Sequence, residues 1–191
     1  MSENNSQYDV IVIGAGVAGL YQLFKLRQLK LKALVIEAGD NVGGTWYWNR
    51  YPGARFDSES WSYGYSFSKE LFEEWDWPEH FAAQPDTLRY LNYVADKFDL
   101  RRDIKFDRRV EASVFDQENN LWTVRTNTEE EYVARFLITA LGPLSAFTLP
   151  NIEGRETFKG PAYHTARWPH EEVDFSGKRV GIIGTGACAI Q

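Results

Sequence analysis

Two glycine-rich turns and one carboxylate are the residues whose types and spacing best indicate chemistry in this chain. A run of β-branched residues, Val10–Ile13, leads directly into Gly14-Ala15-Gly16-Val17-Ala18-Gly19. In such a Gly-x-Gly-x-x-Gly turn, Gly14 permits the tight turn, Gly16 lets a pyrophosphate approach the backbone, and Gly19 lets helix and strand pack closely. The N–H groups of the helix that follows would face the phosphates. The turn therefore predicts a dinucleotide site.

Glu37 stands where a dinucleotide-binding fold carries its ribose-binding acid. It follows the predicted strand 32–36 and lies 23 residues after Gly14. Its carboxylate can accept hydrogen bonds from both ribose hydroxyls and would repel a 2′-phosphate, which favours FAD or NAD over NADP at this site. The alternative is an ordinary strand–helix–strand unit with a surface glutamate.

A second glycine turn follows the apolar segment 179–183, and it begins 170 residues after Gly14. Its pattern predicts a second dinucleotide site formed by Gly184, Thr185, Gly186 and Ala187. Two such turns indicate one nucleotide that is kept as a redox centre and one that is exchanged as a hydride donor. The ribose selector of the second site would lie about 20 residues further on, so the residues leave NADH and NADPH open. We expect Cys188 to be a packed small residue rather than an activated thiol.

The periodicity predicts the elements that position these residues. Helices are expected over 17–29 and 86–98, with an antiparallel meander made of 109–115, 121–126 and 131–133 and a buried strand over 135–140. Segment 41–57 is expected to be ordered loop, and the aromatic side chains of 61–81 are expected to pack in a core. The fold class is therefore α/β and Rossmann-like: a parallel sheet with a βαβ unit and a small antiparallel meander, followed by the start of a second Rossmann-like domain.

Composition excludes several other classes of protein. The net charge of −6 and the absence of a basic stripe argue against nucleic-acid binding. The chain has one cysteine, which fits a reducing cytoplasm and excludes a disulphide reductase with its cysteine pair. No segment is long and apolar enough to suggest a membrane span, and no cluster of side chains has metal-ligand spacing.

The segment between the two turns carries the most specific pattern. Phe158-Lys159-Gly160-Pro161-Ala162-Tyr163-His164-Thr165-Ala166-Arg167-Trp168-Pro169 resembles the Baeyer–Villiger monooxygenase fingerprint Phe-x-Gly-x-x-x-His-x-x-x-Trp-Pro at every defined position. Gly43-Gly44-Thr45-Trp46, with Tyr51-Pro52-Gly53 and Asp57, is similar to a second signature of that family. The spacing through 75–77 and 95–99 looks like the branch that oxidises phenylacetone, steroids and large-ring ketones. Leu141 and Cys188 depart from the family pattern.

This resemblance implies an enzyme that uses NADPH and O₂ to insert oxygen next to the carbonyl of a small ketone, giving an ester or lactone. It implies FAD-binding for residues 1–142, a connector at 143–177, and the first strand and glycine turn of an NADP-binding domain at 178–191. The FAD site would consist of Gly14, Gly16, Gly19, Glu37, Gly44, Thr45, Trp46, Asp57, Tyr63 and Val110. Asp57 would also act in catalysis by orienting a flavin-side arginine beyond Gln191.

Other readings stay open at this point. His164 is expected to fix the connector through hydrogen bonds rather than to act as a base, and Asp57 could simply cap a loop. An N-hydroxylating or flavin-containing monooxygenase is the second enzymatic reading. A dinucleotide-binding module without turnover is the third reading. We expect the 191-residue chain to be inactive alone.

Overall fold

The computed structural model describes residues 7–191, which form two compact units. The first unit comprises residues up to Tyr47 and Leu91–Gly142, and the second comprises Trp48–Tyr90 and Pro143–Gln191. The first unit, like the predicted first domain, ends at Gly142. Residues 48–90 belong to the second unit, in which the Phe56 ring stacks on Tyr63 and the Trp77 ring contacts Tyr90.

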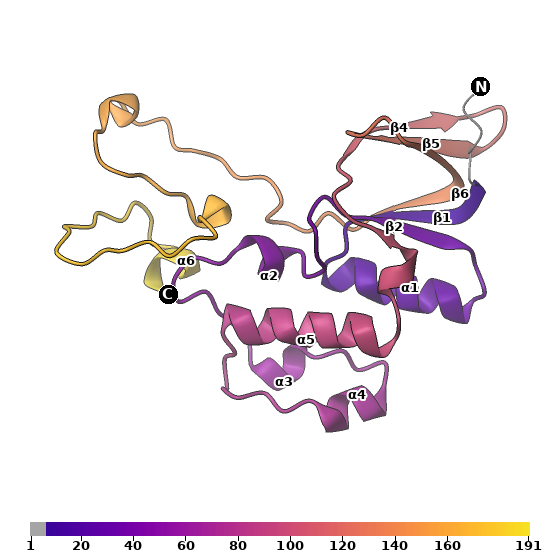
Figure 1. The fold of residues 1–191 in the computed structure, drawn as a ribbon, viewed down its shortest axis with the longest axis horizontal. Helices are drawn as coiled ribbons and strands as arrows, with labels where there is room; N and C mark the ends of the chain where they lie inside the picture. The colour runs from indigo at the N-terminus through magenta and orange to yellow at the C-terminus, as the bar shows by residue number, and fades with distance from the viewer. Residues whose placement is uncertain (1–6) are drawn as a thin grey trace. The chain divides into compact units, whose positions relative to one another are not determined.

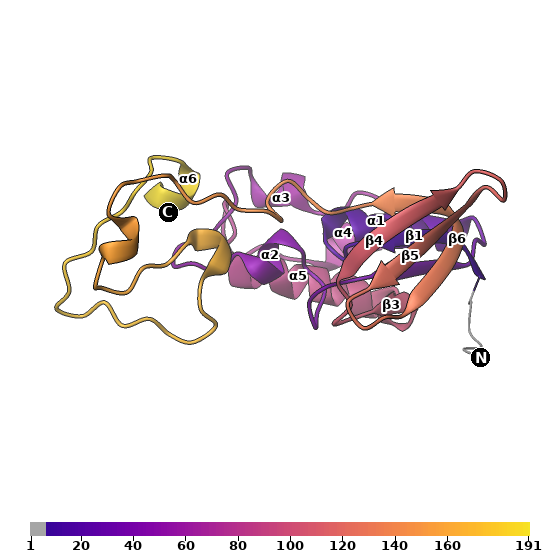
Figure 2. The same ribbon diagram turned by 90° about the horizontal axis from the view of Figure 1, so that it is seen from above.

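One mixed sheet forms the first unit (Figures 1 and 2). Its strand order is β3-β2-β1-β6-β5-β4. The strands β1 (Gln7–Ile13), β2 (Ala33–Ile36), β3 (Ile104–Lys105) and β6 (Glu131–Thr139) are parallel, and β5 (Leu121–Thr126) and β4 (Val110–Asp116) continue the sheet in antiparallel pairing. The Rossmann-like arrangement with an added meander is confirmed.

Helix α1 (Val17–Gln28) packs on this sheet (Figure 1). It buries Leu20, Leu23 and Leu26, which recur at the three-residue spacing of one helical face. The sheet is apolar where it is covered: a core cluster joins Ile11, Leu34, Ile36, Val124, Tyr132 and Ala134. This packing fixes the positions of the ends of β1 and β2, where the first glycine turn and Glu37 lie.

Strand β6 differs from its prediction in two ways. Sequence analysis divided it into 131–133 and 135–140, whereas the structure forms one strand, Glu131–Thr139. Its first half pairs with both β5 and β1, and the register with β5 ends at Ala134. Beyond that point β1 is the only strand of the described residues that pairs with β6. Phe136 is 54% exposed, and Arg135 and Thr139 are also exposed, so the prediction of a buried strand over 135–140 is wrong.

Short helices occupy the segments between β2 and the meander. These are α2 (Thr45–Trp48), α3 (Ser60–Tyr63) and α4 (Lys69–Glu74), followed by the longer α5 (Gln84–Lys97) and the 3-10 turn η1 (Arg101–Asp103). Helix α5 confirms the predicted periodicity, with Leu91, Val94 and Ala95 buried. Helix α2 lies inside the segment predicted to be entirely loop.

Packed aromatic rings dominate the second unit. The Trp77 ring contacts Trp75, Tyr90 and Phe56, with centroids 4.9–5.8 Å apart. Residues 143–177 are irregular, with 3-10 turns η2 (Arg155–Thr157) and η3 (Thr165–Arg167), and the chain ends in helix α6 (Ala187–Ile190). The predicted strand over 179–183 is not formed, because no strand of the described residues lies beside it to pair.

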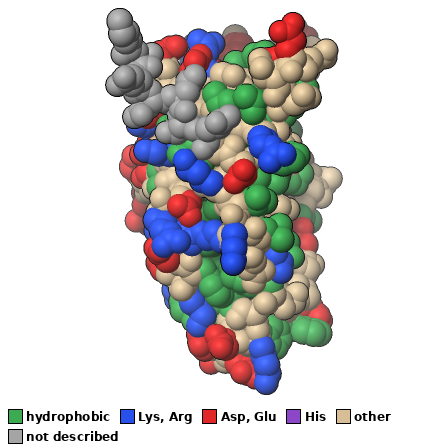
Figure 3. Space-filling view, turned by 90° about the vertical axis from the view of Figure 1, so that its right-hand side faces the viewer, with side chains coloured by type: hydrophobic (Ala, Val, Ile, Leu, Met, Phe, Trp, Pro, Cys, Tyr) green, Lys and Arg blue, Asp and Glu red, His purple; other side chains and the backbone are tan. Residues whose placement is uncertain are grey.

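The surface carries mixed chemistry. On the face shown in Figure 3, basic, acidic and hydrophobic side chains alternate, and no single charge sign dominates. Within residues 7–191, no helix has both the length and the apolarity that a membrane crossing requires.

Candidate dinucleotide site

The first glycine turn leaves β1 in a conformation that only glycine adopts easily. Gly14 has φ +102°, and a Cβ built on it would lie 2.6 Å from the carbonyl oxygen of Ala140. The Gly14 N–H donates to the Ile36 carbonyl oxygen at 2.8 Å. A Cβ on Gly19 would collide with the Gly14 carbonyl oxygen. The first and third glycines thus allow the strand ends and the helix to meet without a gap.

The second glycine of the turn faces the diglycine Gly43-Gly44. A Cβ on Gly16 would lie 3.2 Å from the Cα of Gly44, and a Cβ on Gly44 would lie 2.7 Å from the Cα of Gly16. The Gly43 N–H donates to the Ala15 carbonyl oxygen at 3.0 Å. Gly16 is therefore needed for contact between two backbone segments, a role that sequence analysis had assigned only to a pyrophosphate.

The first glycine turn leads directly into the start of α1. Gly16 is the N-cap, no side chain caps the helix, and its first turn contains no acidic residue. Backbone N–H groups at a helix start, together with the helix dipole, attract an anion. The residues present fit the phosphates of a dinucleotide.

Glu37 is buried and directed at this turn. Only 5% of the residue is exposed. Its Oε2 accepts a hydrogen bond from the Ala15 N–H at 2.7 Å, and its Oε1 accepts one from the Gly39 N–H at 2.8 Å. A carboxylate offers about four lone-pair sites, so two acceptor sites remain for hydroxyl donors. The carboxylate thus lies beside the turn, as a ribose ligand would.

The other residues predicted for the first unit lie on elements joined to this centre. Trp46 is buried in α2, and Thr45 begins that helix directly after the diglycine. Val110 begins β4 and packs against the core cluster. The Arg108 N–H donates to the Glu37 carbonyl oxygen at 2.9 Å, which brings the start of β4 to the Glu37 segment.

The remaining predicted residues lie in the second unit. Asp57 is exposed, and its Oδ1 accepts from the Gln191 Nε2 at 3.0 Å. The Tyr63 ring stacks on Phe56, with centroids 4.0 Å apart. Gln191 was not predicted as a partner of Asp57; its place just after the second glycine turn was the available signal in the sequence.

Tyr51 binds the oxygen of the Gln191 amide, whereas Asp57 binds its nitrogen. Its hydroxyl donates to the Gln191 Oε1 at 2.7 Å. Burial raises the pKa of the Tyr51 hydroxyl well above its ordinary value, and Cys188 and Asp57 act in the same direction. Tyr51 therefore stays protonated and remains a donor. The Gln191 amide thus links Tyr51 to Asp57.

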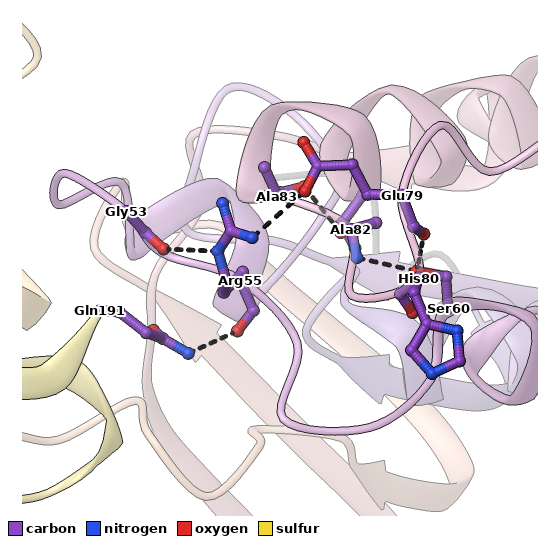
Figure 4. A network of polar contacts seen from close by, with 9 residues as sticks. Gly53, Arg55, Ser60, Glu79, His80, Ala82, Ala83 and Gln191 are labelled. Atoms are coloured by element: carbon purple, nitrogen blue, oxygen red, sulfur yellow. Dashed lines mark hydrogen bonds and ion pairs between the residues drawn. The ribbon is translucent and has the colours of Figure 1, made fainter.

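A polar network orders the segment that carries Asp57 (Figure 4). The Gln191 Nε2 donates to the Arg55 carbonyl oxygen at 3.0 Å, and the Arg55 guanidinium pairs with Glu79 at 3.1 Å. The buried Ser60 hydroxyl accepts from the Ala82 N–H at 2.7 Å and lies 2.8 Å from the Glu79 carbonyl oxygen. The turn 79–82 and the segment 55–60 are thereby tied together.

The second glycine turn is open in the structure. Gly184 has φ +122°, and no heavy atom lies within 4 Å of a Cβ built on Gly184 or Gly186. Thr185 is exposed, and Ala187 begins α6. Cys188 is also exposed, so the expectation of a packed residue is wrong, because the one-turn helix α6 buries none of its residues.

His164 makes a local structural contact. Its Nδ1 accepts from the Ala166 N–H at 3.1 Å, and its ring packs on Phe147. This is the hydrogen-bonding role expected of it in the connector. Among residues 7–191, no group of three or more His, Cys, Asp or Glu side chains has the arrangement of a metal site.

Comparison with known proteins identifies the family. A family model described as pyridine nucleotide-disulphide oxidoreductase matches residues 11–191. The chain belongs to this family. The chain has a single cysteine, so it lacks the intramolecular cysteine pair of a disulphide reductase.

Curated relatives include three monooxygenases. The chain is 51% identical to 2-oxo-Delta(3)-4,5,5-trimethylcyclopentenylacetyl-CoA monooxygenase of Pseudomonas putida, over 96% of this chain and 35% of that protein. It is 50% identical to acetone monooxygenase (methyl acetate-forming) of Gordonia sp., over 96% and 34%. It is 45% identical to phenazine N-monooxygenase PhzNO1 of Lysobacter antibioticus, over 100% and 35%. The chain spans about a third of the length of these relatives.

Solved structures agree with this assignment. An oxidised steroid monooxygenase bound to NADP has a TM-score of 0.91 and 56% identity, over 97% of this chain and 36% of that one. The protein OTEMO in complex with FAD and NADP has a TM-score of 0.90 and 51% identity, over 96% and 36%. The resemblance to Baeyer–Villiger monooxygenases is confirmed at the level of that group.

Proposed function

We propose that this chain is the N-terminal, FAD-binding part of an NADPH- and O₂-dependent Baeyer–Villiger monooxygenase. The observation that carries the proposal is the buried Glu37 carboxylate on the Ala15 N–H, beside the helix start that follows the first glycine turn. The similarity to an OTEMO structure with FAD and NADP, and to a relative that forms methyl acetate from acetone, supports both the cofactors and the reaction.

In this proposal the first unit binds FAD through Gly14, Gly16, Gly19, Glu37, Gly44, Thr45, Trp46 and Val110. The N–H groups at the start of α1 would hold the pyrophosphate, and Glu37 would accept from the ribose hydroxyls. Because a second negative charge beside Glu37 is repelled, this site selects FAD over a nucleotide with a 2′-phosphate. Bound FAD, reduced by NADPH, supplies the redox chemistry with O₂.

Asp57 and Tyr63 would complete the flavin end of the site. In our proposal Asp57 orients a flavin-side arginine, because a carboxylate and a guanidinium pair in a bidentate manner. The Gln191 amide, held by Tyr51, restricts the rotation of the Asp57 carboxylate. Gly184, Thr185, Gly186 and Ala187 would bind the pyrophosphate of NADP(H) in an NADP-binding domain that starts near residue 178.

The substrate would be a small-molecule ketone, and we place the protein in the branch that accepts phenylacetone, steroids and large-ring ketones. The 56% identity to a steroid monooxygenase supports this choice. The cytoplasm is the proposed location, since a single cysteine fits a reducing compartment.

Two assays test the proposal. The intact protein that contains this chain should retain yellow flavin on purification and oxidise NADPH faster when a ketone is added. Mass spectrometry should then detect the ester or lactone formed from that ketone. The 191-residue chain alone should bind FAD weakly and show no ketone-dependent NADPH oxidation. Ketone-dependent turnover by the chain alone, or no ester from the intact protein, contradicts the proposal.

N-oxidation is a second candidate, favoured by the 45% identity to a phenazine N-monooxygenase. Incubation with an aromatic nitrogen heterocycle and with a ketone separates the two reactions, because one gives an N-oxide and the other an ester. The complete connector pattern at 158–169 favours the ketone. FAD binding without oxidation of NADPH by the intact protein would instead indicate a binding module.

A further inference from the structure

We propose that Arg101 is a positioning residue for the dinucleotide site, acting through Asn41 on the backbone of the diglycine Gly43-Gly44. This inference rests on the proposed binding of FAD by the first unit. It concerns η1, an element that carries none of the residues singled out for the site from the sequence.

The diglycine requires external support for its conformation. Gly43 has φ +131° and Gly44 has φ +54°, so two consecutive residues occupy the left-handed region. Unfolded glycine explores more conformations than any other residue, which makes such a pair costly to order. The close approach of Gly44 to Gly16 tolerates no side chain, so a small shift of the diglycine would change the backbone surface beside α1.

A hydrogen-bonded chain leads from Arg101 to this diglycine. The Arg101 Nη1 donates to the Asn41 Oδ1 at 2.9 Å. The same oxygen accepts from the Val42 N–H at 2.8 Å, and Val42 is fully buried. The next N–H, that of Gly43, donates to the Ala15 carbonyl oxygen in the first glycine turn. One side-chain oxygen therefore joins the guanidinium to the residue that precedes the diglycine.

Arg101 is itself held by α5. Its Nε donates to the Asp96 Oδ1 at 2.6 Å, and its Nη2 donates to the Asn92 Oδ1. Asn92 and Asp96 are four residues apart and so lie on one face of the helix. Three different nitrogens of one guanidinium are used at once, an arrangement that the single ammonium of lysine does not reproduce. Helix α5 thus provides the side chains that hold the guanidinium in place against Asn41.

Arg102 provides a matched control in the same turn. Its guanidinium contacts Asp99 at 3.0 Å and Asp103 at 3.7 Å, and 64% of its side chain is exposed. The substitutions Arg101→Ala and Arg102→Ala each remove one arginine charge from η1. Only the Arg101 substitution removes a donor to the diglycine segment.

The experiment uses the intact protein, freed of flavin, with four variants: Arg101→Ala, Arg101→Lys, Asn41→Ala and Arg102→Ala. FAD affinity is measured by quenching of flavin fluorescence, and amide hydrogen exchange is followed at Val42, Gly43 and Gly44 without FAD. We expect Arg101→Ala and Asn41→Ala each to weaken FAD binding about tenfold and to speed exchange at these amides. Arg101→Lys should recover less than half of the loss, and Arg102→Ala should match the wild type.

The double variant Arg101→Ala/Asn41→Ala decides whether Arg101 acts through Asn41. FAD binding by the double variant should be no weaker than by either single variant, because both remove the same link. Multiplied losses, or unchanged exchange at Val42 and Gly43 in Arg101→Ala, would overturn the inference. If the wild-type protein does not bind FAD, the proposed function fails instead, and the exchange measurement still tests the link.

Discussion

At the scale of single residues, Glu37 has a structural role as a hydrogen-bond acceptor for the backbone and, in our proposal, a binding role. Its carboxylate satisfies the N–H groups of Ala15 and Gly39, and so stabilises two turns of the first unit. In our proposal the acceptor sites that remain on this carboxylate bind the ribose hydroxyls. A buried carboxylate of this kind is stable because each oxygen already has a partner.

Replacing Glu37 should therefore affect stability and binding to different extents. Glu37→Ala leaves two N–H groups without their acceptor, and we expect a loss of about 2 kcal/mol in the free energy of unfolding. Glu37→Gln keeps one acceptor oxygen, so it should lose less stability while still weakening FAD binding about tenfold or more. Urea denaturation and flavin fluorescence measure the two effects. The exposed Glu111→Gln serves as the control, and equal losses of stability in both glutamine variants would contradict the assignment.

Tyr132 provides a test in pH. Burial, then the negative charge of Glu130, raises the pKa of the Tyr132 hydroxyl from 10.0 to about 12. Folding thus favours the protonated form, and this contribution is complete below pH 10 and is lost as the pH rises from 10 to about 12. The melting temperature should fall across this interval, and less steeply in Tyr132→Phe. Parallel slopes for the two proteins would show that Tyr132 does not titrate in this way.

At the scale of elements, the periodicity of apolar residues predicted the helices and strands whose formation depends on local packing. Helix α1 and helix α5 follow from apolar residues at three- and four-residue spacing, and β1 and β2 follow from β-branched runs. The extent of β6 could not be predicted in this way, because its pattern changes at Ala134, where the pairing with β5 ends. Residues 179–183 have a strand pattern, but a strand also needs a neighbour, which no local pattern supplies.

The candidate site also has parts that the sequence predicted and parts that it could not predict. The glycine turn and Glu37 were predictable because their spacing reflects a fixed local geometry. The approach of Gly16 to Gly44 and the link from Asp57 to Gln191 were not, since each joins segments that are distant in sequence. Such contacts depend on how the elements pack.

A side chain should be tolerated poorly at Gly14, in the turn after β1, and better at Gly142, which lies after β6. Both residues have a positive φ, +102° and +73°, so alanine is strained at either position. A Cβ on Gly14 additionally meets the Ala140 carbonyl oxygen, whereas nothing lies within 4 Å of one on Gly142. We expect Gly142→Ala to cost about 1 kcal/mol and Gly14→Ala about 3 kcal/mol or more, measured by urea denaturation. Equal costs would indicate that backbone strain alone matters.

At the scale of the whole molecule, the chain carries apolar side chains that it does not bury. Ile182, Ile183 and Ile190 are 68%, 78% and 80% exposed. Large exposed apolar groups mark surfaces that another segment or another molecule covers. The chain also spans only about a third of its relatives, so much of their structure has no counterpart in it.

The isolated 191-residue chain is therefore expected to associate in solution. Light scattering should show species larger than a monomer, and a hydrophobic dye should fluoresce more strongly with the chain than with the intact protein. The double substitution Ile182→Ser/Ile183→Ser should reduce both signals, and Leu29→Ser, at another exposed apolar site, should reduce them less. Cooperative unfolding of a monomeric chain without flavin would contradict this expectation.

The joint between β1 and β6 has a mechanical consequence. The Ala140 N–H donates to the Ile13 carbonyl oxygen at 2.8 Å, and Gly14 lies against the Ala140 carbonyl with no side chain between them. The polypeptide leaves this joint only two residues later, at Gly142. A substitution that displaces Ala140 would consequently displace Gly14 as well, because backbone contacts with no intervening side chain join the two residues.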